Sequence, residues 1–141
     1  MIWKILEPYF SKNENWGNPE KLNGFLLLLL YQIRLEVSNK IIIHNAYAEN
    51  GHTKNSQHYI GNAVDFHVQG IQFGEAIRLV HKTLKGLQIE NKVGLGIYPQ
   101  WVNPGFHLDV RGYKARWSKI DGNYVSFDAG LLKIVEKNLS L

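Results

Sequence analysis

The spacing of apolar residues along the chain predicts helices separated by strands. Apolar side chains recur every three or four positions, as on one face of a helix, in residues 71–86. A second helix is expected over residues 18–37, with Asn18 as its cap and Pro19 in its first turn. Its apolar residues cover most of its circumference, so this helix should lie at the centre of the core.

Shorter segments, either β-branched or alternating apolar with polar, are typical of strands. They are residues 40–44, 63–68, 93–98, 106–111 and 115–117. Residues 2–10 are expected to form a short helix or a strand-like lead-in, and residues 128–139 a closing helix capped by Asp128. The 141 residues contain no repeat and no linker. The sequence therefore predicts one α+β domain, with helices packed against a mainly antiparallel sheet.

One predicted strand carries an unusual polar face. In residues 106–111 the apolar side chains alternate with three functional ones, His107, Asp109 and Arg111. The apolar face should pack on the core, so the polar face lines either solvent or a cleft. A site on that face and a plain Asp109–Arg111 salt bridge are both compatible with the pattern.

Composition limits the chemistry that this face can perform. The chain has no cysteine, so a metal could be held only by histidine and carboxylate side chains. The net charge of +4 fits an anionic partner, such as nucleic acid or an acidic cell wall, without choosing between them. The apolar run 25–30 is far shorter than the roughly 20 residues of a membrane span. No secretory signal pattern opens the sequence.

Two stretches of the chain together offer a zinc ligand set. Ser56–Asp65 contains His58 and Asp65 with Gly61 between them, and the strand 106–111 adds His107. Two histidines and one carboxylate form a catalytic zinc site in which the fourth position is left for water. Spacing alone makes this signal moderate, because such residues are common.

The same residues resemble a known family. Ser56-x-His58-x-x-Gly61-x-Ala63-x-Asp65 is similar to the signature of the zinc D-Ala-D-Ala carboxypeptidases. The stretches 94–99 and 105–111, followed by Arg116-Trp117, resemble the second signature of one branch of that family. The likeness covers about residues 40–118.

The resemblance implies a Hedgehog/DD-peptidase type α+β fold and one zinc ion per chain. His58, Asp65 and His107 resemble the three zinc ligands. Members of the family cleave peptide bonds in the stem peptides of bacterial peptidoglycan, as carboxypeptidases or as endopeptidases of the endolysin type. Zinc-activated water is the implied nucleophile, helped by a base and by a cationic group.

Two departures from the family leave the general base open. Many members have an acid three residues before the last histidine ligand, where this chain has Pro104. Many also have an arginine shortly before the first motif, where this chain has Ala48. Asp109, which shares a face with His107, is the first choice as base, or else it orients a ligand histidine. Glu49, in the preceding loop, is the second choice.

Five further residues are assigned to substrate binding. They are Arg111, His52, Ser56, Tyr98 and Trp101. Arg111 is the candidate for binding an oxyanion or a substrate carboxylate, and the two aromatic residues would wall a peptide groove. His52 could equally be a surface histidine of its loop, and Tyr98 could pack in the core.

Three functions are compared on these grounds. The first is a zinc peptidase acting on peptidoglycan stem peptides as a monomer at the bacterial cell wall, in the periplasm, outside the cell or as a phage lysis enzyme. The second is a zinc-binding, peptidase-like module without activity, which the changes at Pro104 and Ala48 favour. The third, a nucleic-acid binder or metal nuclease, has little support because the basic residues are scattered.

Overall fold

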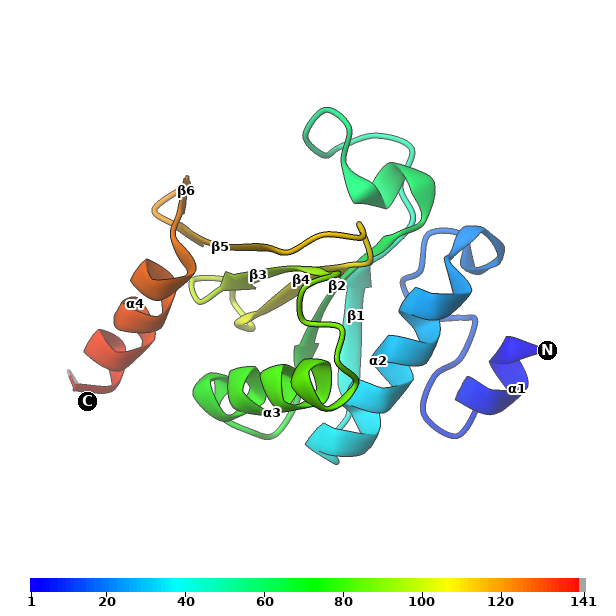
Figure 1. The fold of residues 1–141 in the computed structure, drawn as a ribbon, viewed down its shortest axis with the longest axis horizontal. Helices are drawn as coiled ribbons and strands as arrows, with labels where there is room; N and C mark the ends of the chain where they lie inside the picture. Colours follow the sequence, from blue (N-terminus) through cyan, green and yellow to red (C-terminus); the bar gives the residue numbers. More distant parts are fainter. Residues whose placement is uncertain (140–141) are drawn as a thin grey trace.

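The computed structural model describes residues 1–139 as a single α+β domain, a six-stranded sheet packed with four helices (Figure 1). The helices are α1 (Ile2–Leu6), α2 (Gly24–Val37), α3 (Phe73–Gly86) and α4 (Phe127–Leu139), with two short 3-10 turns, η1 (Pro19–Lys21) and η2 (Gln57–Ile60). The strands are β1 (Ile41–Asn45), β2 (Ala63–Val68), β3 (Gly94–Tyr98), β4 (Gly105–Asp109), β5 (Ala115–Ile120) and β6 (Asn123–Val125). The predicted α+β class is confirmed. Among the described residues, no helix is both long and apolar enough to cross a bilayer.

The sheet has the strand order β1-β2-β4-β3-β5-β6. All neighbours are antiparallel except β3 and β5, which run parallel. After β4 the chain crosses to the other side of β3. There β5 pairs with β3 in the same direction. The strand predicted at 115–117 extends to Ile120 as β5. The strand β6, which is mostly exposed, was not predicted.

Two predicted helix starts are wrong, and side-chain caps explain both. The Asn18 side chain accepts a hydrogen bond from the Glu20 amide and caps only η1, whereas Asn23 caps the separate helix α2. Asp128 lies inside α4, and the Ser126 hydroxyl oxygen accepts from the Ala129 amide instead. Both errors come from choosing the wrong one of two nearby capping residues.

The core lies on one face of the sheet. Phe66 of β2 stacks on Phe106 of β4, with ring centroids 5.2 Å apart, and both side chains are fully buried. Helix α2 contributes buried leucines and Ile33 to the same cluster, and α3 contributes Val80 and Leu84. Figure 1 shows α3 and the segment before η2 on opposite sides of the strands. The polar face of β2 and β4 is consequently left uncovered by helices α2 and α3.

Gly61 fixes the turn between η2 and β2. Its φ of +73° lies in the left-handed region, and its amide donates to the carbonyls of Gln57 and His58. A methyl group at this position would overlap the carbonyl oxygen of Lys21. Only glycine satisfies both conditions, so the sequence position of Gly61 sets the approach of His58 to β2.

We expect Gly61→Ala to lower the free energy of unfolding by about 3 kcal/mol, because left-handed strain adds to the backbone overlap. Gly51→Ala is the matched control. Gly51 also has a positive φ, of +91°, but no atom lies within 4 Å of its would-be Cβ. The control should cost only about 1 kcal/mol. Urea unfolding of the two variants measures the difference, and equal losses would contradict this account of Gly61.

Candidate metal centre

Three side chains from three elements converge on the polar face of the sheet. Asp65 of β2 is paired directly with His107 of β4 in the strand register, and η2 brings His58 to the same point. The Asp65 Oδ1 atom lies 3.0 Å from His107 Nδ1 and 3.2 Å from His58 Nε2. One potential ligand atom from each of the three residues lies within 4.8 Å of the other two. His58, Asp65 and His107 can therefore hold a metal ion; we call them the trio.

Each histidine of the trio also has a contact at the ring nitrogen that faces away from Asp65. The other ring nitrogen of His58, Nδ1, lies 2.6 Å from the carbonyl oxygen of Ala46. The other ring nitrogen of His107, Nε2, lies 2.7 Å from Asp109 Oδ2. These acceptors require a proton on the outer nitrogen, which leaves the inner nitrogen as a lone pair in the neutral ring. This arrangement is the one that orients metal-binding histidines in proteins.

The protons of the trio provide a test of metal fit. Each ring faces an acceptor on both nitrogens, because Asp65 Oδ1 lies on the inner side of both. A neutral imidazole has one N–H, so satisfying all four contacts without a metal needs two imidazolium ions. One divalent cation replaces the two inner protons at the same total charge. The donor set, two imidazoles and one carboxylate, therefore fits such an ion.

The charges around the trio are strongly coupled. Burial by itself would raise the pKa of Asp65, but His107 and His58 hold that pKa well below its ordinary value. Burial opposes a charge on His107, yet Asp109 and Asp65 raise the pKa of its ring. The Asn45 side-chain amide donates to Asp65 Oδ2 at 3.0 Å, which fixes the carboxylate.

Asp109 lies behind His107, away from the cleft. Its side chain is 0% exposed, and it accepts hydrogen bonds from Arg111 Nε at 2.8 Å and Nη2 at 2.6 Å. Burial alone would raise the pKa of Asp109, but Arg111 and His107 hold it well below the ordinary value. A Cβ on Gly94 would come within 2.7 Å of this carboxylate and of Arg111. This position matches the alternative role for Asp109, the orientation of a ligand histidine.

The trio lies at a cleft of about 830 Å³. All five residues assigned to substrate binding line it: Arg111, His52, Ser56, Tyr98 and Trp101. Ser56 has a structural contact as well, because its hydroxyl oxygen accepts from the His58 amide and caps η2. Tyr98 and Trp101 stack with ring centroids 4.4 Å apart. Burial raises the pKa of Tyr98 to about 12, so its hydroxyl stays protonated at neutral pH.

Glu49, the second candidate base, is not brought to the trio. It is exposed and is not among the residues that line the cleft. Its place in the loop before the first motif was its only support, and loop sequence does not fix side-chain position. Among the described residues, Asp65 is the one carboxylate in the cleft lining.

Trp117 lines the cleft but was not among the residues assigned to substrate binding from the sequence. Its ring centroid lies 5.1 Å from that of His107, and its Nε1 donates to the Tyr98 hydroxyl at 2.9 Å. Gly96, opposite it in the β3–β5 pair, has no side chain, and a Cβ there would overlap the indole. The glycine at alternate positions 94 and 96 was the available signal that bulky groups cover this strand.

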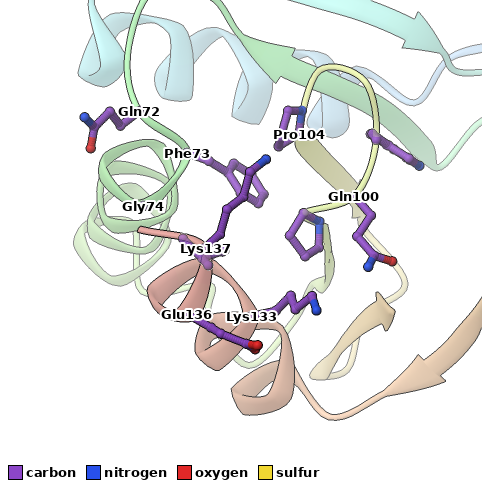
Figure 2. Close-up of a pocket in the computed structure, with 11 residues that line it drawn as sticks. Gln72, Phe73, Gly74, Gln100, Pro104, Lys133, Glu136 and Lys137 are labelled. Carbon is purple, nitrogen blue, oxygen red and sulfur yellow. The ribbon is translucent and has the colours of Figure 1, made fainter. Parts of the chain in front are cut away.

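A second cleft, of about 760 Å³, lies between the start of α3, the turn after β3 and helix α4 (Figure 2). Its labelled lining includes Phe73, Gln100, Pro104, Lys133 and Glu136. Trp101 lines both clefts. The trio is the one cluster of three metal-ligating side chains found in the described part of the chain, so the first cleft is the candidate site.

Comparison with known proteins adds no relative to this picture. No family model, no curated protein and no solved structure matches the chain. The geometry of the site and the sequence motifs are therefore the basis for proposing a function.

We expect the purified protein to bind about one divalent metal ion per chain, and His58→Ala and His107→Ala to abolish this binding, because each removes one of three ligands. His81→Ala is the control, since His81 lies on α3 and packs on Phe127. Metal content by mass spectrometry, after dialysis against zinc, checks this. An unchanged metal content in either ligand variant would contradict the site.

Proposed function

We propose that the protein is a zinc-dependent peptidase that hydrolyses peptide bonds in bacterial peptidoglycan stem peptides. The observation that carries the proposal is the trio, with each histidine anchored from behind and its inner nitrogen aimed at Asp65. The sequence motifs around these residues, which resemble those of the zinc D-Ala-D-Ala carboxypeptidases, supply the substrate class. The α+β sheet is compatible with the Hedgehog/DD-peptidase type of fold that the resemblance implies.

Zinc is the ion that the donor set favours. Two imidazoles and one carboxylate, with an open fourth position, are typical of catalytic zinc, whereas calcium and magnesium prefer oxygen ligands alone. When bound, zinc polarises a substrate carbonyl and makes water a stronger acid. His58, Asp65 and His107 would hold it.

The surrounding side chains would bind the substrate or orient a ligand histidine. Arg111 lines the cleft while its Nε and Nη2 stay bound to Asp109, so the edge of the guanidinium that faces away from Asp109 would be the part that contacts a substrate carboxylate or oxyanion. The stacked Tyr98 and Trp101 form an aromatic wall for a peptide. Asp109 positions His107 rather than taking a proton from substrate, because it is fully buried behind that ring.

One observation favours a second candidate, a zinc-binding module without peptidase activity. Among the described residues of the cleft lining, no carboxylate other than the proposed ligand Asp65 is present to act as a base. His52, which lines the cleft and stacks on His58, is then a side chain that could exchange a proton with substrate. The peptidase proposal therefore depends on His52 more than the sequence motifs suggested.

We expect the wild-type protein to shorten or cut purified stem peptides, to lose this activity with a chelator and to regain it with added zinc. Released amino acids or peptides, separated by chromatography, give the bond that is cut. A protein that binds zinc but leaves these peptides intact would support the module instead. His58→Ala, which removes a ligand, serves as the inactive control.

We expect Asp109→Asn to weaken zinc affinity about 10- to 100-fold, because the outer nitrogen of His107 loses its charged acceptor. Activity should return at saturating zinc. Competition against a zinc indicator, with activity measured across zinc concentrations, checks both. An activity that stays low at saturating zinc would instead assign the base to Asp109. Asp128→Asn, the same change at an exposed site on α4, is the control.

A further inference from the structure

The segment between β1 and η2 borders the cleft with little backbone support. Residues 51–57 all line the cleft, and most of residues 49–55 are exposed. Gly51 and Asn55 adopt positive φ, of +91° and +62°. In the described chain, the backbone hydrogen bonds of residues 49–55 are those of His52 with Tyr59 and one turn from the Ser56 amide to the Thr53 carbonyl. The segment is thus fixed near its middle by one side chain.

That side chain is Tyr59, whose hydroxyl makes both of its bonds to one residue. It accepts a hydrogen bond from the His52 amide at 2.8 Å and donates to the His52 carbonyl oxygen at 2.6 Å. Because a hydroxyl offers one proton and two lone pairs, this pair of contacts uses its donor and one acceptor. We call these two hydrogen bonds between Tyr59 and His52 the clamp. Because Tyr59 directly follows His58 in η2, the clamp is connected to a member of the trio.

The clamp determines where the His52 ring lies. The ring stacks on His58 with centroids 4.1 Å apart and planes 13° apart. His52 is the best-buried residue of the run 51–55, whose other members are exposed. Because its neighbours Gly51 and Thr53 are exposed, His52 would lose this stacking if its backbone were free to move.

We propose that Tyr59 is a positioning residue, which holds His52 over His58 so that the His52 ring contacts the peptide group of a substrate bound in the cleft. The substrate part of this inference depends on the proposed peptidase function; the clamp does not. Simple packing does not explain the arrangement, because phenylalanine would fill the same space without either hydrogen bond.

Tyr59→Phe is the test, since it removes the hydroxyl and keeps the ring. Hydrogen exchange of the His52 amide should become at least about tenfold faster, because both bonds that restrain this residue are lost. Zinc content should stay at the wild-type value. With stem peptide as substrate, kcat should fall about 10- to 100-fold with a small change in KM, as expected for a displaced contact group.

A double-mutant cycle with His52→Ala separates positioning from general destabilisation. If Tyr59 acts through His52, Tyr59→Phe lowers kcat in the wild-type background but not in His52→Ala. Tyr9→Phe is the matched control, because the Tyr9 ring packs against Tyr31 and Tyr9 is not among the residues that line the cleft. This control should leave exchange at His52 and kcat unchanged.

Two results would overturn the inference. One is unchanged exchange of the His52 amide in Tyr59→Phe, which would contradict the clamp. The other is an equal loss of kcat from Tyr59→Phe with and without His52, which would contradict positioning. A wild-type protein that cuts no stem peptide, yet shows His52 protection that depends on Tyr59, would reject the proposed function and keep the clamp.

Discussion

The pairing of Asp65 with His107 across neighbouring strands is the constraint on which the site depends. In the β2–β4 register these two residues lie directly opposite each other, so their side chains leave the sheet on the same face at the separation of adjacent strands. A shift of one residue would send one of them into the core. The apolar partners Phe66 and Phe106, paired one position along, prevent that shift because they must stay buried. Core packing and ligand geometry are therefore set by the same register.

The alternation of apolar and polar residues along these strands predicted which side chains share a face of the sheet. The period of 106–111 placed His107 and Asp109 on one face, as they lie in the structure, while the stretch Ser56–Asp65 supplied His58 and Asp65 as ligand candidates. The pattern could not give the order of strands in the sheet, because an alternation of period two does not specify which strand pairs with which. For that reason the parallel β3–β5 pair, which brings Trp117 against His107, was missed. Ser56 was assigned to substrate for its place in the motif, whereas its contact with the His58 amide depends on a turn that apolar spacing does not reveal.

Single side-chain contacts were the least predictable level. Asn18 and Asn23 are both good caps, and only the extended residue Leu22 between them decides that two elements form rather than one helix. Likewise, nothing in the sequence separates Tyr59 from other aromatic residues near the cleft. Its hydroxyl bonds to His52 exist because η2 turns the ring toward a loop with few other restraints.

The row His107, Asp109 and Arg111 explains why a buried carboxylate next to the trio is tolerated. Alternate residues of one strand present an imidazole, a carboxylate and a guanidinium in line, so the buried negative charge has a cationic or N–H partner on each side. An unpaired carboxylate at 0% exposure would cost several kcal/mol. Removing Arg111 would leave Asp109 with His107 as its remaining side-chain partner, which favours a proton on both nitrogens of that ring. A protonated inner nitrogen cannot ligate a metal. Arg111 would therefore help, through Asp109, to keep the inner nitrogen of His107 able to hold a metal ion.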